Sequence, residues 1–121
     1  MDIIEEFENY LKENYNYNPK EKNNTIKNYL SDIKQFINFF DVKFGDKIID
    51  FSRGHYIEYK NYLIKEKERK YTTINRKTAA LSIYENFLIE ISIRKDSNKV
   101  IKKRYYYKIE TGLITVDMIR R

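Results

Sequence analysis

The sequence predicts an all-α fold, and two observations support this prediction. Glycine occurs three times and proline once in 121 residues, which is too few for a loop-rich chain, and the mix of 41% hydrophobic and 35% charged residues suits a folded protein better than a disordered one. The apolar residues also recur at the three- and four-residue steps of amphipathic helices. A chain of this length has room for one domain with a single core, plus a short extension.

The first expected helix covers residues 2–14, and the second begins at Thr25. The segment between them is rich in asparagine and contains the only proline, so we expect a connection there, although Asn18, Pro19 and Glu21 could instead cap an earlier helix start. The apolar stripe of the second helix consists of Ile26, Tyr29, Leu30, Ile33, Phe36, Ile37 and Phe40. Its opposite, wet or ligand-facing side consists of Lys27, Asn28, Ser31, Lys34, Gln35 and Asn38.

Two further helices are expected in the second half of the chain. Gly45 ends the second helix, and Ser52 stands where the N-cap of a third helix should be. The third helix runs into the charged segment 65–70. The fourth extends from about Thr73 to about Ile91, with two threonines as possible caps, and carries a stripe of Ile74, Leu81, Tyr84, Leu88 and Ile91.

Beyond Ser92 the helical pattern stops. Residues 92–112 are polar and basic, and Thr115 then caps another helix that has room for about two turns. We therefore expect a domain over residues 1–95, followed over 96–121 by a linker and the truncated start of a further domain.

The charge of +6 is unevenly distributed. Residues 1–60 hold 9 basic and 11 acidic residues, whereas residues 61–121 hold 15 basic and 7 acidic ones. A basic half of this kind points to a polyanionic partner, most commonly nucleic acid and otherwise an anionic membrane surface. A solvated, lysine-rich face without a partner is the alternative.

Little in the sequence indicates catalysis, and no metal or cofactor is expected. Cysteine is absent, His55 is the only histidine and reads as a surface or capping residue, and no glycine-rich phosphate loop is present. No apolar run approaches the ~20 residues of a membrane span, and the acidic N-terminus does not resemble a signal peptide. A cytoplasmic protein is expected.

The cluster most suggestive of binding is K-Y-T-T-I-N-R-K, residues 70–77, at the start of the fourth helix. A helix N-terminus attracts phosphate, and Asn75 and Arg76 have the forked donors that read adenine and guanine edges. Simple capping with solvated charges is the alternative. The polar side of the second helix is a further candidate, and the basic, tyrosine-rich segment 102–108 could follow a nucleic-acid backbone or form a short strand.

Two segments together resemble a known family: T-I-K-N-Y-L-S-D-I-K-Q-F, residues 25–36, and Y-T-T-I-N-R-K-T-A-A-L-S-I-Y-E-N-F-L, residues 71–88. They are similar to the N-terminal core-binding, SAM-like domain of tyrosine recombinases of the phage integrase family, and H-Y-I-E-Y-K-N-Y-L between them also fits. The resemblance covers about residues 1–95. It implies an orthogonal bundle of four or so helices that forms half of a C-shaped clamp around duplex DNA.

The resemblance, together with the polar clusters, implies a set of DNA-binding residues on the second and fourth helices. They are Thr25, Lys27, Asn28, Lys34, Thr72, Thr73, Asn75, Arg76 and Lys77. The stretch T-G-L-I-T-V-D-M-I looks like the start of the family's catalytic domain, so no catalytic residue is expected here and no tyrosine is nominated as nucleophile.

The expected function is DNA binding within a site-specific recombinase that integrates or recombines a mobile element. By the resemblance, the parent protein cuts and rejoins DNA through a 3′-phosphotyrosyl intermediate. The expected partners are double-stranded DNA and, in the full-length assembly, other recombinase protomers, while the isolated domain is monomeric. Two alternatives stay open: a helical protein-interaction module, and a standalone DNA-binding regulator without a catalytic domain.

Overall fold

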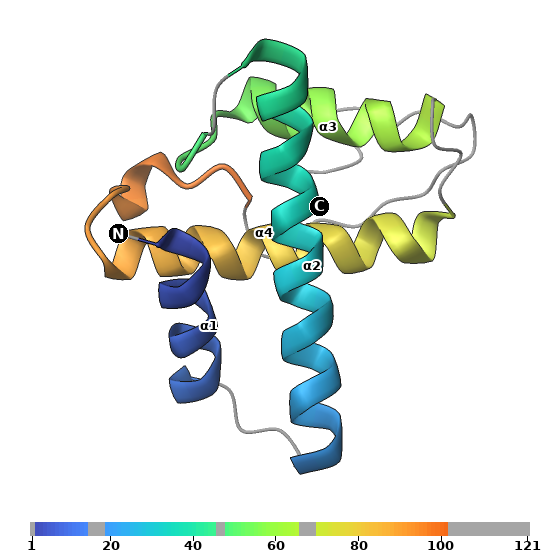
Figure 1. The fold of residues 1–121 in the computed structure, drawn as a ribbon. Coiled ribbons are helices and arrows are strands. Elements are labelled where there is room, and N and C mark those ends of the chain that lie inside the picture. The colour runs from blue at the N-terminus through green and yellow to red at the C-terminus, as the bar shows by residue number, and fades with distance from the viewer. Residues whose placement is uncertain (1, 15–18, 46–47, 66–69, 102–121) are drawn as a thin grey trace. The chain divides into compact units, whose positions relative to one another are not determined.

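The described part of the chain is all helical, as predicted. The computed structural model describes residues 2–14, 19–45, 48–65 and 70–101. These ranges contain four α-helices and a short 3₁₀ turn (Figure 1): α1 (Ile3–Asn14), α2 (Pro19–Phe44), α3 (Arg53–Lys65), α4 (Tyr71–Glu90) and η1 (Asp96–Asn98). The chain divides into two compact units, Met1–Ile49 and Asp50–Arg121.

The first unit consists of α1 and α2, which lie side by side and run in opposite directions (Figure 1). Asp2 caps α1, because its Oδ1 accepts hydrogen bonds from the backbone N–H groups of Ile4 at 3.1 Å and Glu5 at 3.3 Å. Phe7 and Leu11 are fully buried on α1. Five residues of the expected stripe are buried on α2: Ile26, Leu30, Ile33, Phe36 and Phe40.

Helix α2 begins at Pro19, which is the earlier of the two starts that the sequence allowed. Proline suits this position because its missing N–H would have had no acceptor within the first turn, and because its φ is already helical. The expected connection over residues 15–24 is therefore too long. At the other end Gly45 has a φ of +70°, a conformation that glycine adopts at little steric cost, and it ends the helix as predicted.

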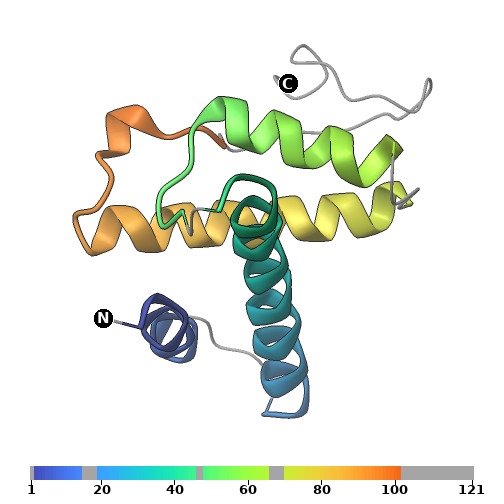
Figure 2. The ribbon, with the colours of Figure 1, turned by 45° about the horizontal axis from the view of Figure 1, so that its top comes forward.

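In the second unit α3 and α4 lie alongside each other (Figures 1 and 2). Ser52 is the N-cap of α3, as predicted: its Oγ accepts a hydrogen bond from the N–H of His55 at 3.2 Å. In return, the N–H of Ser52 donates to Nδ1 of His55 at 3.1 Å. This reciprocal pair resembles a capping box and confirms His55 as a capping residue.

The start of α4 differs from the prediction. The helix begins at Tyr71, and its N-cap is Lys70, which makes no side-chain capping bond. The N–H of Ile74 already donates to the carbonyl of Lys70 at 3.0 Å, so the helical bonding pattern starts two residues earlier than expected. The prediction that Thr72 or Thr73 caps α4 is therefore wrong, and both lie inside its first turn.

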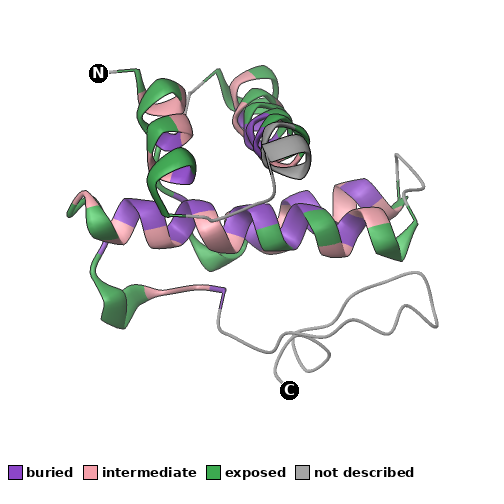
Figure 3. Ribbon diagram, turned by 90° about the horizontal axis from the view of Figure 1, so that it is seen from below, coloured by how far each residue is buried: buried purple, intermediate pink, exposed green. Residues whose placement is uncertain are grey.

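Most of the length of α4 has a buried face (Figure 3). The buried apolar residues on it are Ile74, Ala80, Leu81, Tyr84, Phe87 and Leu88. The ring of Phe51, which precedes α3, stacks on Tyr84 with centroids 6.4 Å apart. This ring pair joins the beginning of the second unit to the middle of α4.

Helix α4 ends in a Schellman motif. The N–H of Ser92 donates to the carbonyl of Ile89 at 3.0 Å, and the N–H of Ile93 donates to the carbonyl of Leu88 at 2.9 Å. Ser92 has a φ of +64°, which glycine usually supplies at this position. The chain then turns back along α4 to Ile101, which is 2% exposed.

Contacts with α4 thus continue beyond residue 95, where the domain was expected to end. Residues 102–121, with the basic segment 102–108 and the expected helix start at Thr115, lie outside the described residues. The division at residue 95 stays a prediction.

Replacing Phe36 or Leu81 with alanine is expected to lower the free energy of unfolding by about 2–5 kcal/mol, because each side chain is buried and leaves a cavity. Lys27→Ala, at an exposed position of α2, is the control and should change it by less than about 0.5 kcal/mol. Urea denaturation measures all three. A loss from Leu81→Ala as small as that from Lys27→Ala would contradict the assigned core.

Ser92→Gly is expected to raise the free energy of unfolding by about 0.5–1 kcal/mol, because glycine removes the steric cost of the positive φ. Ser97→Gly is the matched control: Ser97 has no positive φ, so only the entropic cost of glycine remains. If both variants lose stability equally, the left-handed conformation of Ser92 carries no strain.

Candidate nucleic-acid interface

The polar side of α2 is exposed, as predicted, and is called here the α2 patch. Its members are Lys27, Asn28, Ser31, Lys34, Gln35 and Asn38. Lys27, Ser31, Lys34 and Asn38 follow one another at steps of four, three and four, so they share one line along the helix. The patch thus combines two lysines with amide and hydroxyl groups that donate and accept hydrogen bonds.

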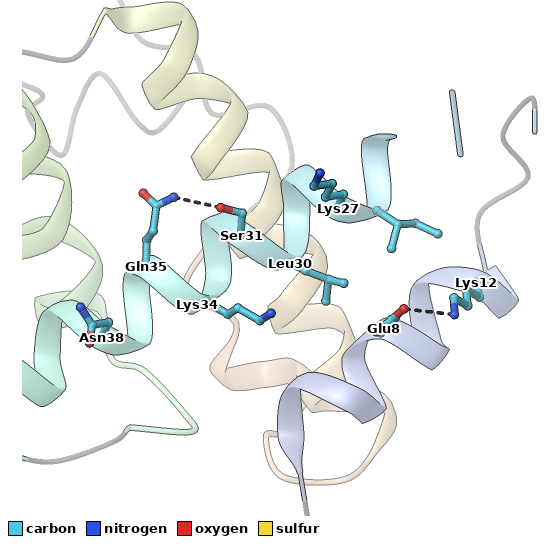
Figure 4. A pocket seen from close by; sticks show the side chains of 9 residues that line it. Glu8, Lys12, Lys27, Leu30, Ser31, Lys34, Gln35 and Asn38 are labelled. Carbon is cyan, nitrogen blue, oxygen red and sulfur yellow. Dashed lines mark hydrogen bonds and ion pairs between the residues drawn. The ribbon is translucent and has the colours of Figure 1, made fainter. Parts of the chain in front are cut away.

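Together with α1, the α2 patch borders an open groove of about 640 Å³ (Figure 4). On the α1 side, Lys12 pairs with Glu8 at 3.1 Å, so these two charges offset each other. On the α2 side, Gln35 Nε2 donates to Ser31 Oγ at 3.0 Å. The positive charge of the groove lining therefore comes mainly from Lys27 and Lys34.

The structure separates the four α2 residues that the sequence analysis assigned to DNA. Lys27 and Lys34 line the groove. Asn28 is exposed beside them but is not part of the lining, and Thr25 is half-buried. At 100° per residue Thr25 lies on the opposite side of the helix from Lys27, so these two cannot contact the same surface.

Four exposed or half-buried residues of α4 share one side of the helix and are called here the α4 strip: Thr72, Asn75, Arg76 and Ala79. Thr72, Arg76 and Ala79 are exposed, and Asn75 is half-buried. Because Thr72 and Ala79 are small, they leave space on both sides of the Arg76 side chain. Three of the five residues predicted on α4 are thus brought together.

The other two predicted residues of α4 lie elsewhere. Lys77 is only 4% exposed, so the expectation that it turns outward is wrong. Lys77 follows Ile74 by three residues and precedes Leu81 by four, which places it on the buried face. Thr73, one turn before Lys77, is half-buried. Contact of these two residues with DNA stays a prediction from the resemblance.

Asn75 carries an unsatisfied polar atom. Its Oδ1 is buried and has no hydrogen-bond partner among the described residues. Leaving such an oxygen unpaired costs about 1–3 kcal/mol. The side-chain amide would gain this free energy if it rotated to a partner that offers both a donor and an acceptor, which is the pattern that an adenine edge presents.

Lys60 is a buried charged group that the sequence analysis did not single out. It is 2% exposed; its Nζ donates to Tyr56 Oη at 3.1 Å and also hydrogen-bonds Thr78 Oγ1. Burial lowers the pKa of Lys60 well below its usual value, since the ammonium group is removed from water. In the sequence, the burial of Lys60 was indicated by its position among the apolar residues of the third helix.

A second buried cluster connects three segments of the second unit. Glu85 on α4 is 0% exposed and pairs with Arg94 Nη1. Arg94 Nη2 also pairs with Asp50 Oδ1 at 2.6 Å, and its guanidinium lies 4.8 Å from the centre of the Phe51 ring. In the sequence, Glu85 was visible only as a charged residue four positions after Leu81 on the apolar stripe.

No group of three or more His, Cys, Asp or Glu side chains is placed in the described ranges to hold a metal ion. No helix in those ranges is long and apolar enough to cross a bilayer.

Comparison with known proteins gives the class of this helical domain. Residues 3–92 match the family described as phage integrase, N-terminal SAM-like domain. The chain belongs to this family, as the resemblance predicted.

A curated relative is named "TnP I resolvase" and comes from Bacillus thuringiensis. The two sequences are 31% identical over 122 residues, which cover 98% of this chain and 41% of the relative. The chain thus spans about two fifths of the length of that protein. No solved structure matches the chain significantly.

Lys60→Met is expected to flatten the dependence of stability on pH. The folded-state pKa of Lys60 lies well below 10.5, the ordinary value that the unfolded chain keeps. Between these two pKa values the unfolded chain binds more protons than the folded chain, so stability rises with pH there. At pH values below the ordinary lysine pKa, the wild type should therefore gain stability with rising pH relative to Lys60→Met. Tyrosine ionisation, which burial delays for Tyr84, acts in the opposite direction only at higher pH.

Urea denaturation at several pH values checks this difference. Lys27→Met is the matched control, because it removes an exposed lysine and should keep the wild-type slope. Parallel profiles for Lys60→Met and the wild type would show that the buried amine titrates as it does in the unfolded chain.

Proposed function

We propose that this chain binds double-stranded DNA, with the α4 strip in the major groove and the α2 patch on phosphates. The observation that carries the proposal is the α4 strip, where Arg76 and Asn75 stand beside the small residues Thr72 and Ala79 on one exposed side of a helix. An α-helix fits the major groove of B-DNA, and small flanking residues let it approach the bases.

The chemistry of the strip favours reading of base edges. An arginine can donate two hydrogen bonds to guanine, and an asparagine can pair with adenine, each worth about 1–3 kcal/mol of discrimination. The unsatisfied Oδ1 of Asn75 supports this reading, because a base edge would supply the partner that it lacks. Arg76 and Asn75 are therefore the proposed specificity residues.

The α2 patch is suited to phosphate contacts rather than to reading of bases. Lys27 and Lys34 project from one line of the helix, with hydroxyl and amide donors between them. Lysines that neutralise phosphates release counterions, so binding through this patch should weaken steeply with salt. Asn28 and Thr25 are proposed as weaker contributors.

The family membership supports a role in site-specific recombination of a mobile element. We infer that the chain is the DNA-binding part of a tyrosine recombinase whose catalytic residues lie outside it, and that the parent assembles with other protomers on DNA. The name of the relative from Bacillus thuringiensis is consistent with this inference.

A protein-interaction module is the second candidate, and one observation favours it. Val42, Phe44 and Ile49 in the first unit are 77%, 58% and 43% exposed. Val42 and Phe44 lie in the last turn of α2, and large exposed apolar side chains can contribute to a surface that contacts another protein.

Arg76→Ala is expected to weaken binding to a DNA duplex selected by the wild-type chain from a random library by about 5- to 150-fold, which corresponds to the loss of one bidentate base contact. Binding to a random duplex should change much less, so the ratio of the two affinities narrows. Competition binding at two salt concentrations measures both affinities. Circular dichroism checks that the variant is folded.

Arg53→Ala is the matched control, because Arg53 is also exposed but lies at the first residue of α3. This variant should weaken binding to the selected and the random duplex equally, or leave both affinities unchanged. Lys103→Ala should likewise lower both affinities and reduce the salt slope by ~0.9, as expected for one phosphate contact. If Arg76→Ala leaves affinity and specificity unchanged, α4 does not read DNA and the protein-interaction candidate is favoured.

A further inference from the structure

Helix α1 distributes its charged residues unevenly around its axis. Its sequence contains one basic residue, Lys12, and Lys12 lines the groove that α1 shares with the α2 patch. Three acidic residues of α1, Glu5, Glu6 and Glu13, are exposed but do not line this groove. Among the described residues that line it, Glu8 is the only acidic one. The groove thus receives the lysine of α1 and a single carboxylate.

The groove has a basic rim over an apolar base. Ile26 and Leu30, which are 4% and 9% exposed, contribute the apolar part of its lining. The side chain of Lys34 extends from α2 toward α1, where Lys12 lies (Figure 4). Lys27 lies seven residues before Lys34, which is roughly 10 Å along the helix axis. Lysines spread over this length and over two helices suit the successive phosphates of a DNA strand better than one small anion.

The ion pair on the α1 side of the groove is exposed to solvent. Lys12 Nζ lies 3.1 Å from Glu8 Oε2, and the two side chains are 54% and 39% exposed. Such a pair contributes little to stability, because water screens both charges. A phosphate group that enters the groove can therefore replace the carboxylate as the partner of Lys12 at a small cost. Glu8 and phosphate compete for the same ammonium group.

We propose that Lys12 is a third phosphate-binding lysine of this groove, and that Glu8 limits DNA affinity by competing with phosphate for Lys12. The proposal rests on the proposed function and extends its phosphate surface from α2 to α1. DNA binding exchanges the Glu8–Lys12 pair for a contact between Lys12 and phosphate. Glu8 lowers the affinity for all duplexes alike, since phosphate contacts carry no sequence information.

Removing the charge of Glu8 tests the competition. The 121-residue chain with Glu8→Gln should bind a random-sequence duplex about two- to fivefold more tightly than the wild type, because Lys12 no longer has to leave a carboxylate. Glu13→Gln is the matched control: it makes the same change at an exposed position of α1 outside the groove, and it should change the affinity less. Equal gains from both variants would show that only net charge acts, and would overturn the role of Glu8.

Lys12→Ala tests the phosphate contact in two backgrounds. In Glu8→Gln it should weaken binding to the selected and the random duplex equally and reduce the salt slope by ~0.9. In the wild type it should cost less affinity, because there the loss of the contact is partly offset by an ion pair that no longer has to be broken. Equal costs in both backgrounds would overturn the competition. No cost in Glu8→Gln would overturn the phosphate contact itself.

Lys27→Ala separates this proposal from the proposed function, and circular dichroism checks that every variant is folded. If Lys27→Ala weakens DNA binding while Lys12→Ala has no effect in either background, the proposed function stands and only the extension to α1 is overturned. A wild-type chain that does not bind duplex DNA would overturn the proposed function and this proposal with it.

Discussion

The buried face of α4 is the constraint on which the second unit depends. Ile74, Leu81 and Leu88 repeat on it at intervals of seven, so one side of the helix is committed to the core over most of its length. The opposite side must then face solvent, and this determines which residues form the α4 strip. The same face receives the ring of Phe51 and, through Glu85, the backbone at Ile101. Core packing and the candidate DNA surface are two sides of one helix.

The buried polar groups of the second unit specify how its segments fit together. Apolar packing alone tolerates small shifts between helices, whereas hydrogen bonds do not. Lys60 has to meet Tyr56 and Thr78, and Glu85 has to meet Arg94 and two backbone N–H groups. Since an unpaired charge in the interior is strongly unfavourable, each pair disfavours arrangements of the elements that would separate its partners.

Family membership and surface chemistry are two independent arguments for the proposed DNA binding. The phage integrase N-terminal family covers residues 3–92 and says what kind of domain this is. The two candidate surfaces differ in character: the α2 patch offers lysines and small polar groups, while the α4 strip offers an arginine and an amide between small residues. Phosphate contacts and base contacts need these two kinds of surface, respectively.

The sequence by itself determined the helices, because their apolar periodicity and the signals of Ser52 and Gly45 act over a few residues. It also determined which side of α2 is wet. Only the tertiary structure decided that Lys77 is buried and that Glu85 holds Ile101, since burial of a charge depends on partners far away in the chain. The early start of α4 and the left-handed conformation of Ser92 were also decided by the tertiary structure. Local propensity does not specify either feature, whereas the packing of the whole helix does.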